Sequence, residues 1–295
     1  MLYHILVFIS NLCCILPANI TRFIGKIIGN LTWYVVPAKR KKMAINNVKR
    51  CLNLSQAQSE AIAKKSWTRF GPMIMEVLRF KKICADIDEY VTIIGAENIQ
   101  KAIDYGKGGV IATAHSGNWE IIGAALTHQG MKIAGVAQHQ RNESANKFIN
   151  YCRAFTGMHI VDKLDIKDMM KMLSKKYFIG LIMDQDGGGT GIYMPVFGYD
   201  ASCVQGPAVM SRFKSAPILP VFITEDKPGH HILFVHEPVF TEHTKDKKAD
   251  IYNMMYELTN LTEKHIRKYP EEWFWLHDRW KHGEEIKKKQ ANNLQ

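Results

Sequence analysis

The sequence predicts an α/β fold, with a mostly parallel central sheet flanked by helices and an N-terminal helical segment that associates with a membrane. Short apolar runs alternate with amphipathic stretches between residues 90 and 214, and such β-then-α succession favours parallel strands. The apolar run 110–114 follows Gly108-Gly109 and is typical of a buried strand. Polar residues occur where expected strands end, which is where parallel sheets bind their ligands.

Length and charge narrow the classes of function. A chain of 295 residues can form one large domain with a substantial core. Lys and Arg number 39 against 28 Asp and Glu, a net charge of +11. This excess indicates an anionic partner, namely a membrane surface, a phosphorylated lipid, an acidic protein or nucleic acid. The six cysteines lack metal-ligand spacing and are scattered, which favours reduced thiols in a body that faces the cytosol.

Residues 1–42 are expected to form a membrane-anchoring helical segment. Leu2 to Leu16 is largely apolar and ends at Pro17, without the basic start or cleavage site of a signal peptide. It is also shorter than the ~20 residues that span a bilayer. Residues 23–36 add interfacial aromatics, and the basic cluster 39–42 follows. This order is typical of an anchor whose basic end meets anionic lipid in the cytoplasm. A helical hairpin in the core with a solvated charge run is the alternative.

Residues 43–285 are expected to form the α/β domain. Ser55-x-x-Gln58 is a capping box that opens a helix, and Gly71-Pro72 should kink it. Expected strands are 90–94, 110–114, 132–137, 159–161, 178–183, 218–223 and 231–236. Helices are expected from about 96, from 118, and over 144–155, 167–176, 206–214 and 249–269. The turn 226–229 predicts a closing hairpin, and residues 286–295 are expected to be a basic disordered tail.

His115 and Glu120 form the strongest candidate pair. His115 ends the expected strand and Glu120 lies in the first turn of the next helix, so the two can meet across the turn. The helix dipole favours an ionised Glu120. Its carboxylate could accept one imidazole proton and leave the other nitrogen as a base. Ser116 lacks the G-x-S-x-G context of a nucleophile, which favours a substrate that supplies its own hydroxyl. The alternative is a polar strand end beside an ordinary helix carboxylate.

A second polar stretch follows the expected strand 178–183. Asp184 ends that strand as His115 ends its own, so both should lie at one edge of the sheet. Asp184 and Asp186 alone are a weak metal signal, and the glycines 187–189 do not match a phosphate-binding loop. We interpret this loop as mobile backbone over the site. The closing tryptophans Trp273 and Trp275 are expected to be core packing alone.

The motif around His115 resembles the signature of a known family. The matching stretches are Ala114–Glu120, Val136–Asn142, Arg153 with Gly157, Met183–Gln185, Pro195–Gly198, Gln205–Ala208 and Trp273–Lys281. Together they are similar to the bacterial lipid A biosynthesis acyltransferases (the lauroyl/myristoyl transferase family), a branch of the glycerolipid acyltransferases. The resemblance covers nearly the whole chain in the same order.

The resemblance implies transfer of a fatty acyl chain from an acyl carrier protein thioester to a hydroxyl of a lipid A precursor. His115 would be the general base, oriented by Glu120. The implied substrate-binding residues are Asn118, Arg141, Arg153, Asp184 and Gln185. Arg153 is the candidate for the oxyanion or a lipid phosphate, because its planar fork suits both, and Arg141 is a second candidate for phosphate.

The implied partners are acyl carrier protein as donor, an anionic glycolipid acceptor and the membrane, with no nucleic acid, metal or cofactor. The implied location is the bacterial inner membrane, with the catalytic domain on its cytoplasmic face. An acyl-coenzyme A donor with a lysophospholipid or glycosylated inositol lipid acceptor is the nearest alternative, followed by an esterase that uses water. A non-catalytic binder of anionic membranes is the alternative from another class, and an aligned base argues against it.

Overall fold

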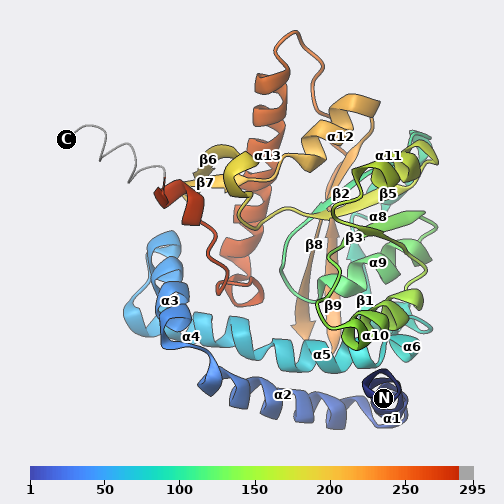
Figure 1. Ribbon diagram of the computed structural model, residues 1–295, viewed down its shortest axis with the longest axis vertical. Helices are drawn as coiled ribbons and strands as arrows, with labels where there is room; N and C mark the ends of the chain where they lie inside the picture. Colours follow the sequence, from blue (N-terminus) through green and yellow to red (C-terminus); the bar gives the residue numbers. More distant parts are fainter. Residues whose placement is uncertain (286–295) are drawn as a thin grey trace.

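A seven-stranded sheet organises the part of the chain described by the computed structural model, residues 1–285 (Figure 1). Its order is β1-β9-β8-β2-β5-β3-β4. The strands are β1 Val91–Ile94, β2 Gly109–Thr113, β3 Ile133–Ala137, β4 His159–Asp162, β5 Phe178–Ile182, β8 Ile218–Lys227 and β9 His230–Val235. All neighbours pair parallel except β8 and β9, which form the predicted hairpin. The predicted mostly parallel α/β sheet is confirmed.

Helices flank this sheet in the expected alternation. Before the first strand come α1 Leu2–Ile15, α2 Ala18–Val35, α3 Ala38–Leu52, α4 Gln56–Thr68, α5 Phe70–Leu78, α6 Phe80–Ile83 and α7 Ile87–Tyr90. Later helices are α8 Ala96–Asp104, α9 Trp119–His128, α10 Glu143–Ala154, α11 Ile166–Ser174, α12 Gly206–Lys214 and α13 Lys247–Lys268. Short 3₁₀ turns η1 Gly188–Thr190 and η2 Pro270–Glu272 complete the set.

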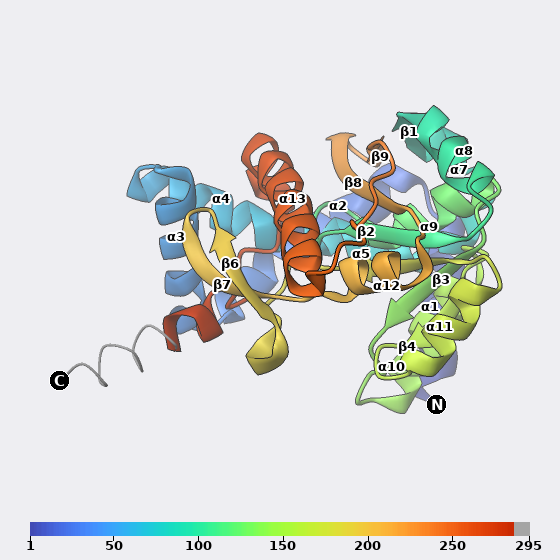
Figure 2. The same cartoon turned by 90° about the horizontal axis from the view of Figure 1, so that it is seen from above.

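The central strand β2 contributes to a core on each side of the sheet. Val110 and Ala112 belong to the core shared with α11, α12 and α13, and Ile111 belongs to the core shared with α8, α9 and α10. Alternate residues of a strand point to opposite faces, so a continuous apolar run is what a strand covered on both faces needs. Figure 1 shows α11 and α12 on one side of the central strands and α9 and α10 on the other, and Figure 2 shows the same elements from above.

Two of the longer elements were not predicted. The antiparallel hairpin of β6 Ile192–Val196 and β7 Tyr199–Cys203 lies outside the main sheet. The helix α3 follows the basic cluster, and it buries Ala44, Val48 and Cys51 at helical spacing. The capping box is confirmed, with both reciprocal bonds of Ser55 and Gln58 present. The tail 286–295 lies outside the described residues.

The N-terminal helices form a layer under the domain (Figure 1). Here α2 packs closely on α5, since a Cβ atom on Gly71 would lie 1.9 Å from the Gly25 carbonyl oxygen. The other side of α2 exposes large apolar side chains, including Phe23 and Leu31 at 63% and 62%. Within residues 1–285, no helix is both long and apolar enough to span a membrane.

Candidate active site

His115 and Asp184 meet at the edge of the sheet where β2 and β5 end. These strands are parallel neighbours with Thr113 opposite Ile182, so residues two positions further along lie side by side. The His115 Nδ1 atom lies 2.8 Å from Asp184 Oδ1, and the His115 backbone N–H donates to Oδ2 at 2.9 Å. The expectation that both residues converge at one sheet edge is confirmed.

Asp184 is held as a buried carboxylate. It is 6% exposed, and its Oδ2 also accepts a 2.6 Å hydrogen bond from Trp273 Nε1. Burial raises the pKa of Asp184, but the charge of His115 and the hydrogen bonds from His115 and Trp273 outweigh it and hold the pKa below its usual value. An ionised carboxylate at Nδ1 selects the tautomer that leaves Nε2 as a free base. Trp273 is therefore more than the core packing expected for it.

The turn after His115 directs its hydroxyl away from the imidazole. Ser116 is buried, and its Oγ lies 3.1 Å from Nε2 of His265. Gly117 has φ +56, and a Cβ atom there would lie 2.5 Å from the Ile223 carbonyl oxygen, so the position requires glycine. The turn is also tied to the segment 272–274, since Phe274 N–H donates to the His115 carbonyl. This geometry gives His115 no nucleophile from Ser116.

The structure corrects the expected partner of Glu120. Its carboxylate binds Arg153 through both oxygens, at 2.9 Å to Nε and 2.6 Å to Nη2. Burial lowers the pKa of Arg153, but the Glu120 hydrogen bond and charge outweigh it and raise that pKa. The carboxylate that binds the imidazole is Asp184. His115 and Asp184 each follow one of two paired strands, which brings them closer together than His115 and Glu120, which are separated by a strand-to-helix turn.

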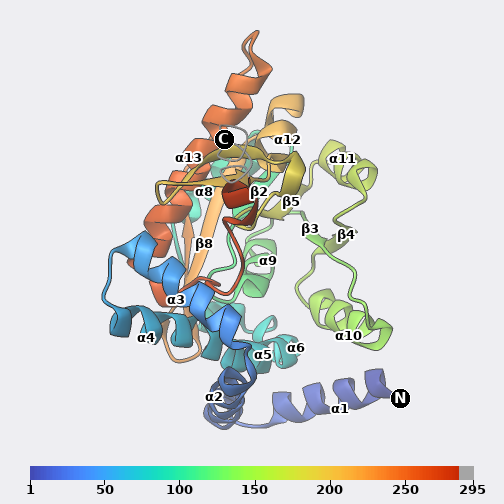
Figure 3. The same cartoon turned by 60° about the vertical axis from the view of Figure 1, so that its left-hand side comes forward.

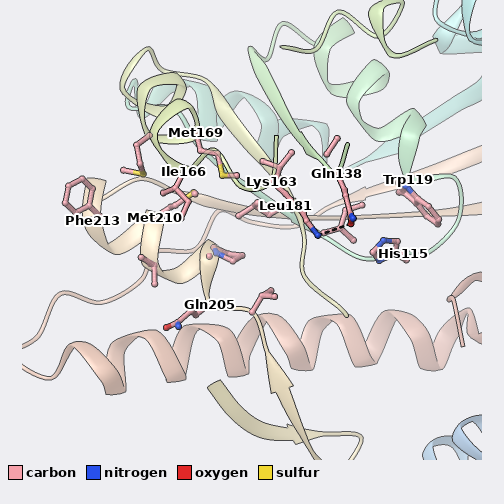
Figure 4. Close-up of a pocket in the computed structure, with 18 of the residues that line it drawn as sticks. His115, Trp119, Gln138, Lys163, Ile166, Met169, Leu181, Gln205, Met210 and Phe213 are labelled. Atoms are coloured by element: carbon pink, nitrogen blue, oxygen red, sulfur yellow. Dashed lines mark hydrogen bonds between the residues drawn. The ribbon is translucent and has the colours of Figure 1, made fainter. Parts of the chain in front are cut away.

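A large cavity opens in front of His115 (Figure 4). Its volume is about 1690 Å³, above the ~300–1,000 Å³ of sites for drug-sized ligands. Much of the wall is apolar, formed by Val136, Phe148, Ile149, Met169, Met170, Leu181, Val209, Met210, Phe213 and Ile251. Leu6 of α1 also lines the cavity, so it extends to the N-terminal layer. Such a wall suits a hydrocarbon chain.

The charged part of the wall is mainly cationic. It contains Arg153, Lys163, Arg212, Lys214 and Lys247, and Glu120 is the acidic residue among the described residues that line it. Arg212 is neutralised by Asp250 at 2.8 Å, whereas Lys163 donates to the neutral amide of Gln138 at 2.9 Å. Sequence reasoning missed Lys163, although it directly follows β4 and so lies at a strand end like His115.

Three other predicted substrate-binding residues lie outside this cavity in the described part of the chain. Asn118 is buried, and its Nδ2 donates to Glu76 Oε2 at 2.7 Å. Arg141 is exposed, and Gln185 is partly buried beyond Asp184. The cavity therefore brings together His115, Glu120 and Arg153, with Asp184 behind the imidazole.

Among residues 1–285, one group of side chains has the composition of a metal site. Ligand-type atoms of Glu76, Glu225 and His231 lie within 4.8 Å of one another. The guanidinium of Arg22 pairs with both carboxylates, and His231 lies 3.2 Å from Glu76. These pairings make the group an ion-pair cluster in which Arg22 compensates part of the negative charge.

A carboxylate-oriented imidazole beside an apolar cavity can deprotonate a hydroxyl that the substrate supplies. The chain is 23% identical to the lipid A biosynthesis lauroyltransferase of Escherichia coli over 254 residues, 82% of this chain and 79% of that protein. It is 23% identical to the phosphatidylinositol mannoside acyltransferase of Mycolicibacterium smegmatis over 66% of this chain, but spans only 64% of that relative's length.

A solved structure, the 1-acyl-sn-glycerophosphate acyltransferase of Thermotoga maritima, aligns at 15% identity with a TM-score of 0.40, covering 82% of this chain and 97% of that one. The match to a protein family covers more of the chain. Residues 1–282 match the family described as bacterial lipid A biosynthesis acyltransferase. The matched curated relatives are named acyltransferases. The chain belongs to the bacterial lipid A biosynthesis acyltransferase family.

Proposed function

We propose that this protein transfers a fatty acyl chain from a thioester to a hydroxyl of a glycolipid precursor of lipid A. The observation that carries the proposal is the His115–Asp184 pair at the edge of a large apolar cavity, with Ser116 directed elsewhere. A cavity of about 1690 Å³ has room for more than one lipid-like ligand.

In the proposed reaction, Nε2 of His115 accepts the proton of the acceptor hydroxyl as its oxygen attacks the thioester carbonyl carbon. The tetrahedral intermediate collapses with loss of the thiolate, which takes the proton from the imidazolium. The products are the ester and the free thiol. Asp184, in place of the expected Glu120, orients the ring and stabilises its charged form.

The cations of the cavity suit the anionic groups of such substrates. Arg153 uses Nε and Nη2 for Glu120, so we assign its remaining Nη1 to an oxyanion or a phosphate oxygen. Lys163 lines the same cavity and has a neutral partner. Its full charge is therefore free to pair with a substrate anion. Neither Arg141 nor Asn118 lines the cavity, and we assign no substrate contact to them.

We further propose that α1 and α2 lie in the membrane surface. Figure 3 shows α1 along the page where Figure 1 shows it nearly end-on, and the reverse holds for α2, so the two helices lie crosswise in one layer. Their outer faces expose Phe8, Phe23 and Leu31. Amphipathic helices that expose an apolar face bind in the plane of the membrane–water interface. Because Leu6 lines the cavity, a lipid acceptor could enter from this layer.

The membrane proposal is tested by replacing two exposed apolar residues of α2. Burying a Phe or Leu side chain stabilises by ~1.5–3 kcal/mol, so Phe23→Asn with Leu31→Asn should lower the liposome partition coefficient by at least about 10²-fold. Ile94→Asn, an exposed apolar residue on β1, is the control. Equal binding of the double variant and the control to liposomes would contradict the membrane proposal.

The function is tested by mass spectrometry of lipids from cells with and without the protein. We expect one fewer acyl chain on lipid A in cells that lack it, and restoration by the wild-type chain but not by His115→Ala. Unchanged lipid A together with a changed inositol lipid would favour the phosphatidylinositol mannoside acyltransferase activity named in a relative.

The donor is tested by a salt series with one acyl chain on two carriers. The protein carries a net charge of +11, and complementary charge raises encounter rates by ~10–10³ at low salt. We propose acyl carrier protein as donor and expect its kcat/KM to fall more steeply with salt than that of the coenzyme A thioester. A preference for coenzyme A with equal salt slopes would instead favour the lysophospholipid or inositol-lipid alternative.

A further inference from the structure

The turn His115–Asn118, here called the catalytic turn, is held by hydrogen bonds from a single guanidinium on the side of α4 and α5. Arg69 Nη1 donates to the Gly117 carbonyl at 2.8 Å, and Nη2 lies 3.3 Å from the His115 carbonyl. One rigid fork therefore bridges two carbonyls, two residues apart, on the turn that carries the base. The planar spacing of its donors makes arginine suited to such a bridge.

The position of Arg69 is set by a break between two helices. It lies between α4, which ends at Thr68, and α5, which begins at Phe70. Pro72 has no N–H and cannot donate to the Thr68 carbonyl, so the helix is interrupted here, one turn before the predicted kink. Burial lowers the pKa of Arg69 to about 10, which still leaves it a cation at neutral pH. The guanidinium carbon also lies 5.9 Å from the ring centre of Trp119.

Glu76 of α5 holds the other end of the turn. Glu76 Oε2 accepts the 2.7 Å bond from Asn118, the N-cap residue of α9. The same oxygen lies 3.2 Å from His231 Nε2, and Arg22 of α2 pairs with Oε1 at 3.3 Å. Burial raises the pKa of Glu76, but His231, Asn118 and Arg22 outweigh it and keep the pKa below its usual value.

We propose that Arg69 and Glu76 are positioning residues for acyl transfer. They act through the backbone of the His115–Asn118 turn and through the start of α9, and so fix where the imidazole stands relative to the cavity. The inference rests on the proposed function, and it adds a role for the N-terminal helices. Through Arg22, α2 supports the catalytic turn as well as facing the membrane.

Arg79 provides a matched control. It is 3% exposed, and its Nη1 donates to the Cys13 and Leu16 carbonyls at 2.5 and 2.6 Å. Both arginines therefore hold two backbone carbonyls, but Arg79 holds the end of α1, away from the catalytic turn. If both arginines had only a structural role, replacing either one should have a similar effect on kcat.

The test measures kcat and KM in detergent micelles from thiol release, with a dodecanoyl thioester and total membrane lipid as acceptor. Misplacement of a catalytic group by about 1 Å can cost ~10²-fold, so Arg69→Ala should lower kcat by about 10²-fold with KM within about threefold. Added methylguanidine should restore about tenfold of that loss by refilling the fork. Arg69→Lys and Glu76→Gln should each lower kcat by about tenfold, without rescue.

Arg79→Ala should keep kcat within about threefold of wild type even if its melting temperature falls. Equal kcat losses in Arg69→Ala and Arg79→Ala, or a folded Arg69→Ala with wild-type kcat, would overturn the proposal. If Arg69→Ala does not fold, a wild-type kcat in Arg69→Lys would overturn it. His115→Ala in the same assay separates the two claims: an active His115→Ala rejects the proposed function, whereas an inactive one with a normal Arg69 variant rejects only this inference.

Discussion

The catalytic turn and the wall of the cavity are built in opposite ways. In the turn, each polar side chain has a fixed partner, with His115 on Asp184, Ser116 on His265 and Asn118 on Glu76. In the wall, apolar side chains lie among lysines such as Lys214 and Lys247. We infer from this difference that the proposed chemistry depends on a preorganised network, whereas the choice of substrate depends on surfaces that can change without disturbing that network.

The largest expected effect comes from removing the base. Proton transfer by a positioned side chain contributes ~10²–10⁴-fold, so His115→Ala should lower kcat by about 10³-fold with folding intact. His243 lines the same cavity, and His243→Ala should stay within about threefold of wild type. The measurement is steady-state acyl transfer by purified protein, with circular dichroism to verify folding. Similar losses of kcat in both variants would contradict the proposed difference in role between the catalytic turn and the cavity wall.

His265, which contacts Ser116 of the catalytic turn, should affect the pH dependence of the free energy of unfolding. Burial lowers the pKa of His265 to about 4, below the unfolded value of about 6.5. Between these values the unfolded chain binds a proton that the folded chain does not. The stability due to neutral His265 is therefore complete above about pH 7 and is lost as the pH falls from about 6.5 towards 4.

His265→Gln can still hydrogen-bond Ser116 but does not titrate. Chemical denaturation at pH 7.5 and pH 5 should show that this variant loses about 2 kcal/mol less stability than wild type on acidification. Identical losses in the two proteins would mean that His265 is not buried in its neutral form.

A change in the wall should alter the preferred substrate and leave the chemical step intact. Val209→Phe narrows the cavity between α11 and α12. Since one methylene in a pocket is worth ~1–3 kcal/mol, the ratio of kcat/KM for a short over a long acyl donor should rise by about tenfold. The kcat with the short donor should be unchanged. A uniform loss with every chain length would place Val209 in the chemistry instead.

Much of the fold could be read from local patterns. An apolar run after Gly108-Gly109 predicted β2, a second apolar run predicted β5, and the capping box at Ser55 predicted the start of α4. The hairpin of β6 and β7 was missed because Pro195 and the preceding glycines obscure its alternation. The helix α3 was missed because its first turn is basic, although its buried face repeats at helical spacing.

The site was only partly predictable for a different reason. His115 follows a strand and is visible locally, but its carboxylate partner depends on which strand lies beside β2. The strand that matters is β5, which is followed by Asp184, 69 residues after His115, and strand order is a property of the whole sheet. Glu120 was preferred because it is near in sequence. Arg69 gives no local signal, since its acceptors are backbone carbonyls.

The central claim is that Asp184 makes His115 a base and Glu120 does not. Single-turnover rates of Asp184→Asn and Glu120→Gln test it most directly, with melting temperatures as the control for folding. An amide at Asp184 cannot hold the productive tautomer, so the account predicts a rate loss of about 10²–10⁴-fold. Glu120→Gln should act mainly on KM through Arg153. A folded Glu120→Gln that loses as much single-turnover rate as Asp184→Asn would contradict the account.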